Sequence, residues 1–143
     1  MASFTKVNDF VKNMANAMDL DSDSLKIALS NTDPTSGTDV TADGNGVLAN
    51  IVEISYTNLS NRDLANLTST QTSGTYKLSS YDTVLTASGG SVAAFRYVVI
   101  YNDTPTSPED PVIGYYDYGS SLTLNDGDTF TVDIGTNGLF TVA

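Results

Sequence analysis

Three aspartates at alternate positions are the first residues in the chain that could do chemistry. Asp19, Asp21 and Asp23 lie in the stretch DLDSDS, and carboxylates in such an array are ligands that Ca²⁺ prefers. A calcium-binding helix-loop-helix motif, however, requires glycine at loop position six and a bidentate acid at position twelve; counted from Asp19, those positions hold Ser24 and Ser30. We therefore interpret the stretch as a solvated connection whose Asp side chains accept hydrogen bonds from nearby backbone N–H groups. Binding of an adventitious cation is the alternative.

Two further groups of acidic and polar side chains lie in loops. Asp39, Asp43 and Asn45 occur in the turn-rich segment 31–46, where a plain loop is the simpler interpretation and a cation site is the alternative. The other group lies in and near the loop NDTPTSPEDP, and its members are Asp103, Glu109, Asp110 and Asp117. A glycosidase needs two carboxylates at a set separation, and nothing in the sequence fixes one. We therefore expect no enzymatic activity, no cofactor and no metal site.

Two missing residue types exclude most other catalytic chemistry. The 143-residue chain contains neither cysteine nor histidine, so it has no thiolate nucleophile, no disulfide and no catalytic triad that depends on imidazole. Seventeen acidic residues against six scattered basic ones give a net charge of -11. Because contacts with phosphates need clustered positive charge, we expect neither nucleic acid nor an anionic membrane surface as a partner. The apolar runs are also far shorter than the roughly 20 residues of a membrane helix.

Apolar periodicity predicts one helix at the N-terminus. Apolar residues recur at spacings of three and four from Phe4, which is typical of an amphipathic helix, and Ser3 is its expected cap. The members of this stripe are Phe4, Val7, Phe10, Val11, Met14 and Met18. We divide the chain into an N-terminal helix or arm at 1–20 and a β-sandwich domain at 21–143. The helix either packs on the domain or forms an arm that docks on a neighbouring subunit.

Period-two alternation predicts strands through the rest of the sequence. The expected strands cover 25–30, 47–56, 75–80, 93–103, 111–119 and 136–143, and the polar stretch at 57–75 is a loop or one short strand. The strand at 93–103 is apolar on both faces and should therefore be central in its sheet. Asp126-Gly127 predicts a hairpin between 122–124 and 130–134. Seven or eight strands without a second helix pattern predict a mainly all-β fold, an antiparallel β-sandwich or jelly-roll-like domain.

Tyrosines cluster on two consecutive predicted strands. They are Tyr97 and Tyr101 on the first strand and Tyr115, Tyr116 and Tyr118 on the second. Tyrosine combines a large contact area with a polar tip, so the cluster is either an interaction face or a platform for sugars. The simpler alternative is that about half of these rings cover the edges of the sandwich.

Several stretches of the chain resemble a family of small virion proteins of tailed bacteriophages. They are VNDFVKNMANAM, SLKIALSNT, QTSGTYKL, TASGGSVAAFRYVVIYNDT, PVIGYYDYGSSLTLNDGDTFTVDI and GLFTV, which together cover nearly the whole chain. The likeness is one of pattern and carries no catalytic motif. The resemblance implies a head decoration (cement) protein, made in the host cytoplasm and located on the outer capsid surface of the virion. The alternative is a tail or head-fibre component that contacts the host surface or its glycans.

The resemblance also implies a partner and a mechanism. The expected partner is the phage major capsid protein, and each copy would bridge neighbouring capsid subunits and stabilise the assembled shell by mass action. We expect the contacts in the N-terminal segment, in the loops at 31–46 and 102–111, and on the tyrosine-rich strands. The candidate contact residues are Phe4, Val7, Phe10, Met14, Val40, Tyr101, Tyr115 and Tyr116. Self-association on the capsid, as a dimer or trimer, stays open.

Overall fold

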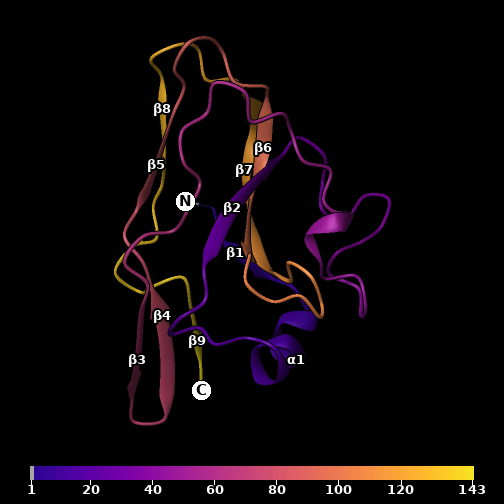
Figure 1. Ribbon diagram of the computed structural model, residues 1–143, viewed down its shortest axis with the longest axis vertical. Helices are drawn as coiled ribbons and strands as arrows, with labels where there is room; N and C mark the ends of the chain where they lie inside the picture. The colour runs from indigo at the N-terminus through magenta and orange to yellow at the C-terminus, as the bar shows by residue number, and fades with distance from the viewer. Residues whose placement is uncertain (1) are drawn as a thin grey trace.

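The computed structural model describes residues 2–143 and consists mainly of antiparallel β-strands (Figure 1). Within these residues, nine strands form three sheets. The four-stranded sheet has the order β1 (Phe4–Lys6), β7 (Val112–Leu122), β6 (Phe95–Asn102) and β2 (Leu25–Ser30). The smaller sheets are β3 (Thr68–Thr72), β4 (Thr75–Ser79) and β9 (Phe140–Val142), and β5 (Thr83–Thr86) with β8 (Thr129–Val132). The expected all-β class with one short helix near the N-terminus is confirmed.

The four-stranded sheet is buried on both faces along β2, β6 and the first part of β7 (residues 112–115), because these segments are largely apolar on both faces. One face packs against the two smaller sheets, and Ile100 there shares a core with Leu78 of β4 and Leu85 of β5. The other face is covered by the segment between β2 and β3, where Val40 packs in a second core with Val99. In Figure 1 the small sheets lie on the left, the four-stranded sheet in the centre and the covering segment on the right.

The strand β6 is the centre of this arrangement. It pairs with β7 on one side and with β2 on the other, and every residue of β6 except Arg96 is buried. Val, Ile and Tyr favour such a pleated surface, and full burial of each Val or Ile side chain stabilises the fold by roughly 1.5–3 kcal/mol. The prediction of a central strand from its two apolar faces is confirmed.

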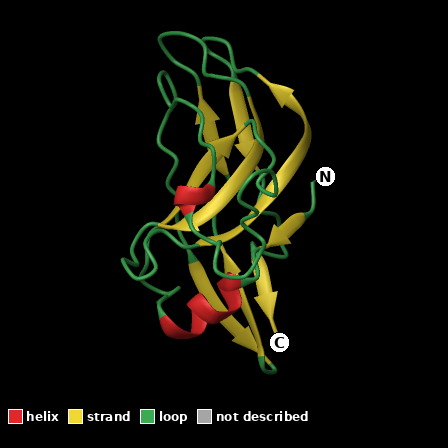
Figure 2. Ribbon diagram, turned by 90° about the vertical axis from the view of Figure 1, so that its right-hand side faces the viewer, coloured by secondary structure: helices red, strands yellow, loops and turns green. Residues whose placement is uncertain are grey.

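The N-terminal helix is shorter than the sequence predicts. Residues Phe4–Lys6 form β1, which pairs with β7, and the helix α1 covers only Asp9–Asn16. The expected cap at Ser3 is therefore wrong, because pairing with the open edge of β7 favours extended backbone before the helix. Phe10 on α1 packs edge to face on Phe140 of β9, with ring centroids 4.8 Å apart. Figure 2 shows α1 in red at the same end of the molecule as the C-terminus.

Two expectations for later segments are also wrong. The segment 47–56 is not a strand; it contains a short 3-10 helix, Leu48–Asn50, and only single bridging residues. The Asp126-Gly127 turn forms, with Asp128 N–H donating to Asn125 O, but the strands that flank it do not pair. Leu124 O instead accepts from Val92 N–H, and β8 pairs with β5.

One further strand agrees with the prediction from the sequence, and another was not predicted. The polar stretch at 57–75 contains one short strand, β3, which is the second of the two expected alternatives. The strand β5 was not expected from the sequence. Neither helix in the part of the chain that the structure describes has the length and apolar character that a membrane crossing needs.

Candidate docking groove

An apolar groove opens between two strands that pass each other without pairing. One is β7 of the four-stranded sheet, called the middle sheet below, and the other is β8 of the two-stranded sheet. Its volume is about 160 Å³. The residues that line it are Ala2, Val98, Tyr116, Tyr118, Phe130, Thr131, Val132 and Asp133. In Figure 1 the two strands stand apart, with β8 at the left edge of the molecule and β7 in the centre.

Aromatic rings form the walls of the groove. Phe130 packs edge to face on the buried Phe95, with ring centroids 5.3 Å apart, and edge to face on Tyr118 at 5.5 Å. Such T-shaped pairs are a preferred geometry of aromatic rings. Tyr118 is 53% exposed, so the row of rings runs from the core to an open face that a partner can cover.

Open strand edges flank the same groove. β8 pairs with β5 on one edge, and no strand of residues 2–143 pairs with its other edge. On β7, β1 pairs only with residues 114–116, so the half of β7 that carries Tyr118 has no β1 partner. Unpaired N–H and C=O groups on strand edges accept another extended chain.

The polar groups of the groove lining include the carboxylate of Asp133 and the phenols of Tyr116 and Tyr118. Asp133 is the acidic residue of the lining, and it is exposed. Burial, and after it the negative charge of Asp133, raises the pKa of Tyr116 above its ordinary value. Tyr116 is therefore a neutral hydrogen-bonding group at physiological pH, and the groove offers apolar surface with a single negative charge at its rim.

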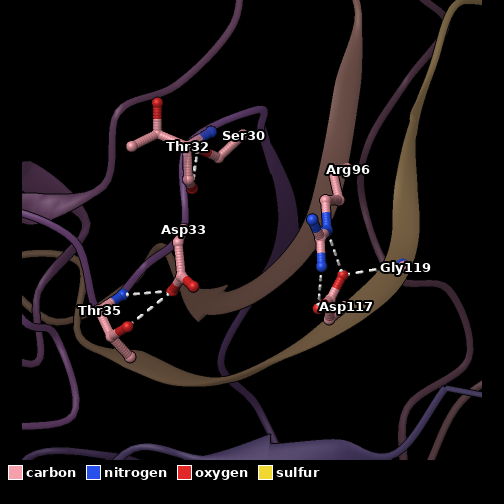
Figure 3. Close-up of polar contacts among 7 residues, drawn as sticks. All are labelled: Ser30, Thr32, Asp33, Thr35, Arg96, Asp117 and Gly119. Carbon is pink, nitrogen blue, oxygen red and sulfur yellow. Dashed lines mark hydrogen bonds and ion pairs between the residues drawn. The ribbon is translucent and has the colours of Figure 1, made fainter.

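A bulge in β7 carries Tyr118. Arg96 of β6 donates two hydrogen bonds to Asp117, of 2.7 and 2.8 Å, and Gly119 N–H donates a third to Asp117 at 2.8 Å (Figure 3). The hydrogen bond from Arg96 is the main cause of the lowered pKa of Asp117. Gly119 has a φ of 96°, which favours glycine. This ion pair closes the bulge and fixes the backbone on either side of Tyr118.

The opposite edge of the middle sheet is already occupied. Along β2, Tyr56 Oη accepts from Leu29 N–H at 3.0 Å and donates to Glu53, while Arg62 donates to Ile27 O. The Arg62 guanidinium lies 3.6 Å above the Tyr56 ring. Burial, and then the hydrogen bond to Glu53, raises the pKa of Tyr56 far above its ordinary value. A partner strand therefore finds no open backbone there.

The aspartates of DLDSDS bind local backbone, as the sequence predicts. Asp21 N–H donates to Asp19 at 3.2 Å, and Asp19 N–H donates to Asp23 at 2.9 Å. Asp23 also accepts from Asn102 Nδ2 at 2.7 Å, which ties the connection to β6. No group of three or more acidic residues among residues 2–143 is arranged to hold a metal ion.

Three of the other acidic candidates, Asp39, Asp103 and Asp117, also have partners within the chain. Asp39 accepts from the N–H and the hydroxyl of Thr41, at 2.8 and 2.7 Å. Figure 3 shows the same arrangement at Asp33, whose pKa is lowered mainly by the backbone N–H of Thr35. Asp103 lies 3.0 Å from Lys26, and Asp117 pairs with Arg96. These contacts give the carboxylates structural roles in turns and ion pairs.

The structure divides the candidate contact residues between core and surface. Five of them are buried within this chain: Val7, Phe10, Val40, Tyr101 and Tyr115. Phe4, Met14 and Tyr116 are partly exposed and border the first core. The N-terminal segment thus packs on its own domain, the first of its two expected alternatives, and the loop at 31–46 is anchored through Val40.

The tyrosine cluster is split between the two faces of the middle sheet. Tyr97, Tyr101 and Tyr115 lie in the core beneath the covering segment, whereas Tyr116 and Tyr118 line the groove. Sequence reasoning missed Phe130, because the alternation that marks its strand does not reveal which strand lies opposite.

No protein-family model, no curated protein and no solved structure matches the chain. The resemblance to bacteriophage virion proteins stays a prediction, and the groove is interpreted from its own geometry.

Proposed function

We propose that the chain is a bacteriophage head decoration, or cement, protein that binds the outer capsid lattice and bridges major capsid protein subunits. The observation that carries the proposal is the groove between β7 and β8, which combines partly exposed aromatic rings with open strand edges. Exposed apolar surface of this kind marks a site for binding another polypeptide. The resemblance of the sequence to small virion proteins supports the same role.

The charge and the fold of the chain suit a protein that acts by binding to the surface of an assembled shell. A net charge of -11 keeps free copies soluble and discourages unspecific association. Bound copies act only on the assembled shell, so they stabilise it by mass action. A copy that contacts two neighbouring capsid subunits needs only modest affinity for each, because the second contact forms within the complex. The proposal assigns the chain no catalytic role.

The proposed contact with the capsid lies in the groove and no longer at most of the contact residues expected from the sequence. An extended segment of the capsid protein would place an apolar side chain against Tyr118 and Phe130 and align its backbone with the edge of β8. A lysine or arginine in that segment would complement Asp133. Of the earlier candidates, Tyr116 stays in this contact, and Phe4 supports it by packing on Tyr116 at 5.0 Å between ring centroids.

The experiment is to image purified particles with and without this protein and to compare their resistance to heat. Surface density over the head lattice that is lost with the protein, together with heads that burst at a lower temperature, supports the proposal. A few copies confined to the tail favour the adhesion alternative. Absence of the protein from the particle contradicts both.

A further inference from the structure

The chain contains four bonds in which an acidic or amide residue precedes glycine: Asp43-Gly44, Asn45-Gly46, Asp126-Gly127 and Asn137-Gly138. Such bonds react without a catalyst. The glycine nitrogen loses its proton and attacks the side-chain carbonyl carbon; asparagine expels ammonia, aspartate expels water, and a five-membered succinimide forms. Water then opens the ring to aspartate or to isoaspartate. Glycine permits the reaction because it has no side chain to obstruct the required backbone rotation.

One carboxylate blocks the reaction at two of these bonds. Asp9 accepts from Gly44 N–H at 2.9 Å and from Gly46 N–H at 2.9 Å. Both nitrogens are the attacking atoms of their bonds, and a hydrogen bond to a carboxylate keeps the proton on each. Asp43 and Asn45 are therefore protected by the first turn of α1.

The bond in the Asp126-Gly127 turn is blocked on both sides. Gly127 N–H donates to Ala87 O at 2.9 Å, which holds the attacking nitrogen. Asp126 Oδ1 accepts from Gly89 N–H at 3.0 Å, which turns the side-chain carbonyl away. Both partners come from the segment after β5, so the reaction requires this contact between two loops to open.

We propose that Asn137 is the deamidation site of this protein. Asn137 is exposed, and its side chain makes no hydrogen bond among residues 2–143. Gly138 N–H donates only to Gly135 O, at 3.3 Å, within the same turn. A long bond inside an exposed turn opens more readily than a bond to a distant element. The attacking nitrogen at Asn137 is thus held only within its own turn, whereas the attacking nitrogens at the other three bonds are held by residues far away in the chain.

Conversion to isoaspartate would loosen the C-terminal strand. The reaction inserts one methylene into the main chain directly before Gly138, whose backbone packs so closely on β4 that an added Cβ would lie 2.6 Å from Leu78 O. The next residue, Leu139, is buried and donates its N–H to Leu78 O at 2.8 Å. A longer main chain at this point shifts the pairing of β9 with β4, whereas conversion to ordinary aspartate only adds a charge.

The test is to age the full chain in mildly alkaline buffer, both folded and unfolded in denaturant, and to map each site by peptide mass spectrometry. In the unfolded chain Asn45 and Asn137 should convert at similar rates, because both precede glycine. In the folded chain Asn137 should keep a similar rate while Asn45 slows by about tenfold or more, since hydrogen bonds to a charged group must break first. Replacement of Asp9 by alanine should return Asn45 to the rate of Asn137.

A matched variant tests the consequence. Aged wild type should gain faster hydrogen exchange in β9, and aged Asn137→Ser should not. Equal rates at Asn45 and Asn137 in the folded wild type would overturn the proposal. The proposal would also be overturned if Asn137 stayed intact in the folded chain while it converted in the unfolded chain. Both comparisons use the wild-type protein, so they do not depend on how well the variants fold.

Discussion

Tyr118 of β7 and Phe130 of β8 pack edge to face, with ring centroids 5.5 Å apart, although their strands belong to different sheets. The chain that joins these strands forms no hairpin, so this ring pair spans a gap that backbone pairing leaves open. An aromatic contact at the mouth of an open groove is typical of a binding surface. The pair therefore connects the fold with the proposed attachment to a capsid.

Replacement of Tyr118 by alanine should weaken binding to phage heads without unfolding the protein. The side chain is 53% exposed, so its loss should cost the fold little beyond the ring pair, about 0.5–1.5 kcal/mol. Loss of a central aromatic anchor weakens an interface by at least roughly tenfold. The measurement is the binding curve of the purified variant on heads that lack the protein.

A matched control for this variant is Val84→Ala on β5. Val84 is exposed to a similar extent, 51%, and does not line the groove. Its replacement should leave the binding curve unchanged. Equal weakening by both variants would show that the groove has no special part in attachment.

Replacement of Tyr56 by phenylalanine should destabilise the fold by about 1–3 kcal/mol, because Leu29 N–H and Glu53 each lose a hydrogen-bond partner at a part-buried site. The free energy of unfolding in denaturant measures the effect. Tyr81→Phe is the control, since Tyr81 is 67% exposed and its loss of a hydroxyl should change stability by less than about 0.5 kcal/mol. A Tyr56→Phe variant with the same free energy of unfolding as wild type would contradict the role of Tyr56 in closing the β2 edge.

Replacement of Val40 by alanine should loosen the segment that covers the second face of the middle sheet. Val40 is fully buried beside Val99, and removal of two buried methyl groups should cost roughly 2 kcal/mol, with a further cost for the cavity. Hydrogen exchange should rise in the segment at 33–46. The control is Val52→Ala, at a residue that is 61% exposed, and it should leave both stability and hydrogen exchange unchanged. If Val40→Ala had the same stability and hydrogen exchange as this control, the loop would not be anchored at Val40.

The Arg96–Asp117 pair should make stability depend on pH in acid. Because the hydrogen bond from Arg96 lowers the pKa of Asp117 in the folded state, the pair stabilises the fold fully above the ordinary aspartate pKa of about 3.9. This stability is lost as the pH falls through the lowered pKa. The destabilisation caused by Asp117→Asn should therefore be present at neutral pH and shrink in strong acid.

The control for this pH dependence is Asp21→Asn, which removes the same charge from an exposed side chain. Unfolding curves of both variants and the wild type, recorded from neutral pH into strong acid, give the comparison. A difference in the free energy of unfolding between Asp117→Asn and wild type that stays constant across this pH range would contradict a structural role for the ion pair.

Sequence patterns predicted the middle sheet well and the groove poorly. β2 and β6 were evident because alternation and two apolar faces are local properties of each strand. The Asp126-Gly127 signal predicted a reversal of the chain correctly and the pairing wrongly, since Leu124 bonds with Val92 and β8 with β5. A turn specifies a change of direction, but the choice of partner strand depends on packing across the core.

The candidate contact residues show the same limit. Phe10, Val40 and Tyr115 were named as candidate capsid contacts, and the structure places these apolar side chains in the core. Tyr118 and Phe130 lie together because strands of two different sheets pass each other without pairing, an arrangement that no local pattern encodes. The acidic turns were predicted correctly at Asp19, since Asp side chains bind backbone within a few residues.

The most direct test of the central proposal is to add the purified protein to phage heads that lack it and to image the particles. The proposal expects saturable binding of many copies at equivalent positions over the head lattice, and a higher temperature of head rupture at saturation. Heads that bind no protein, or binding confined to the tail, would contradict it.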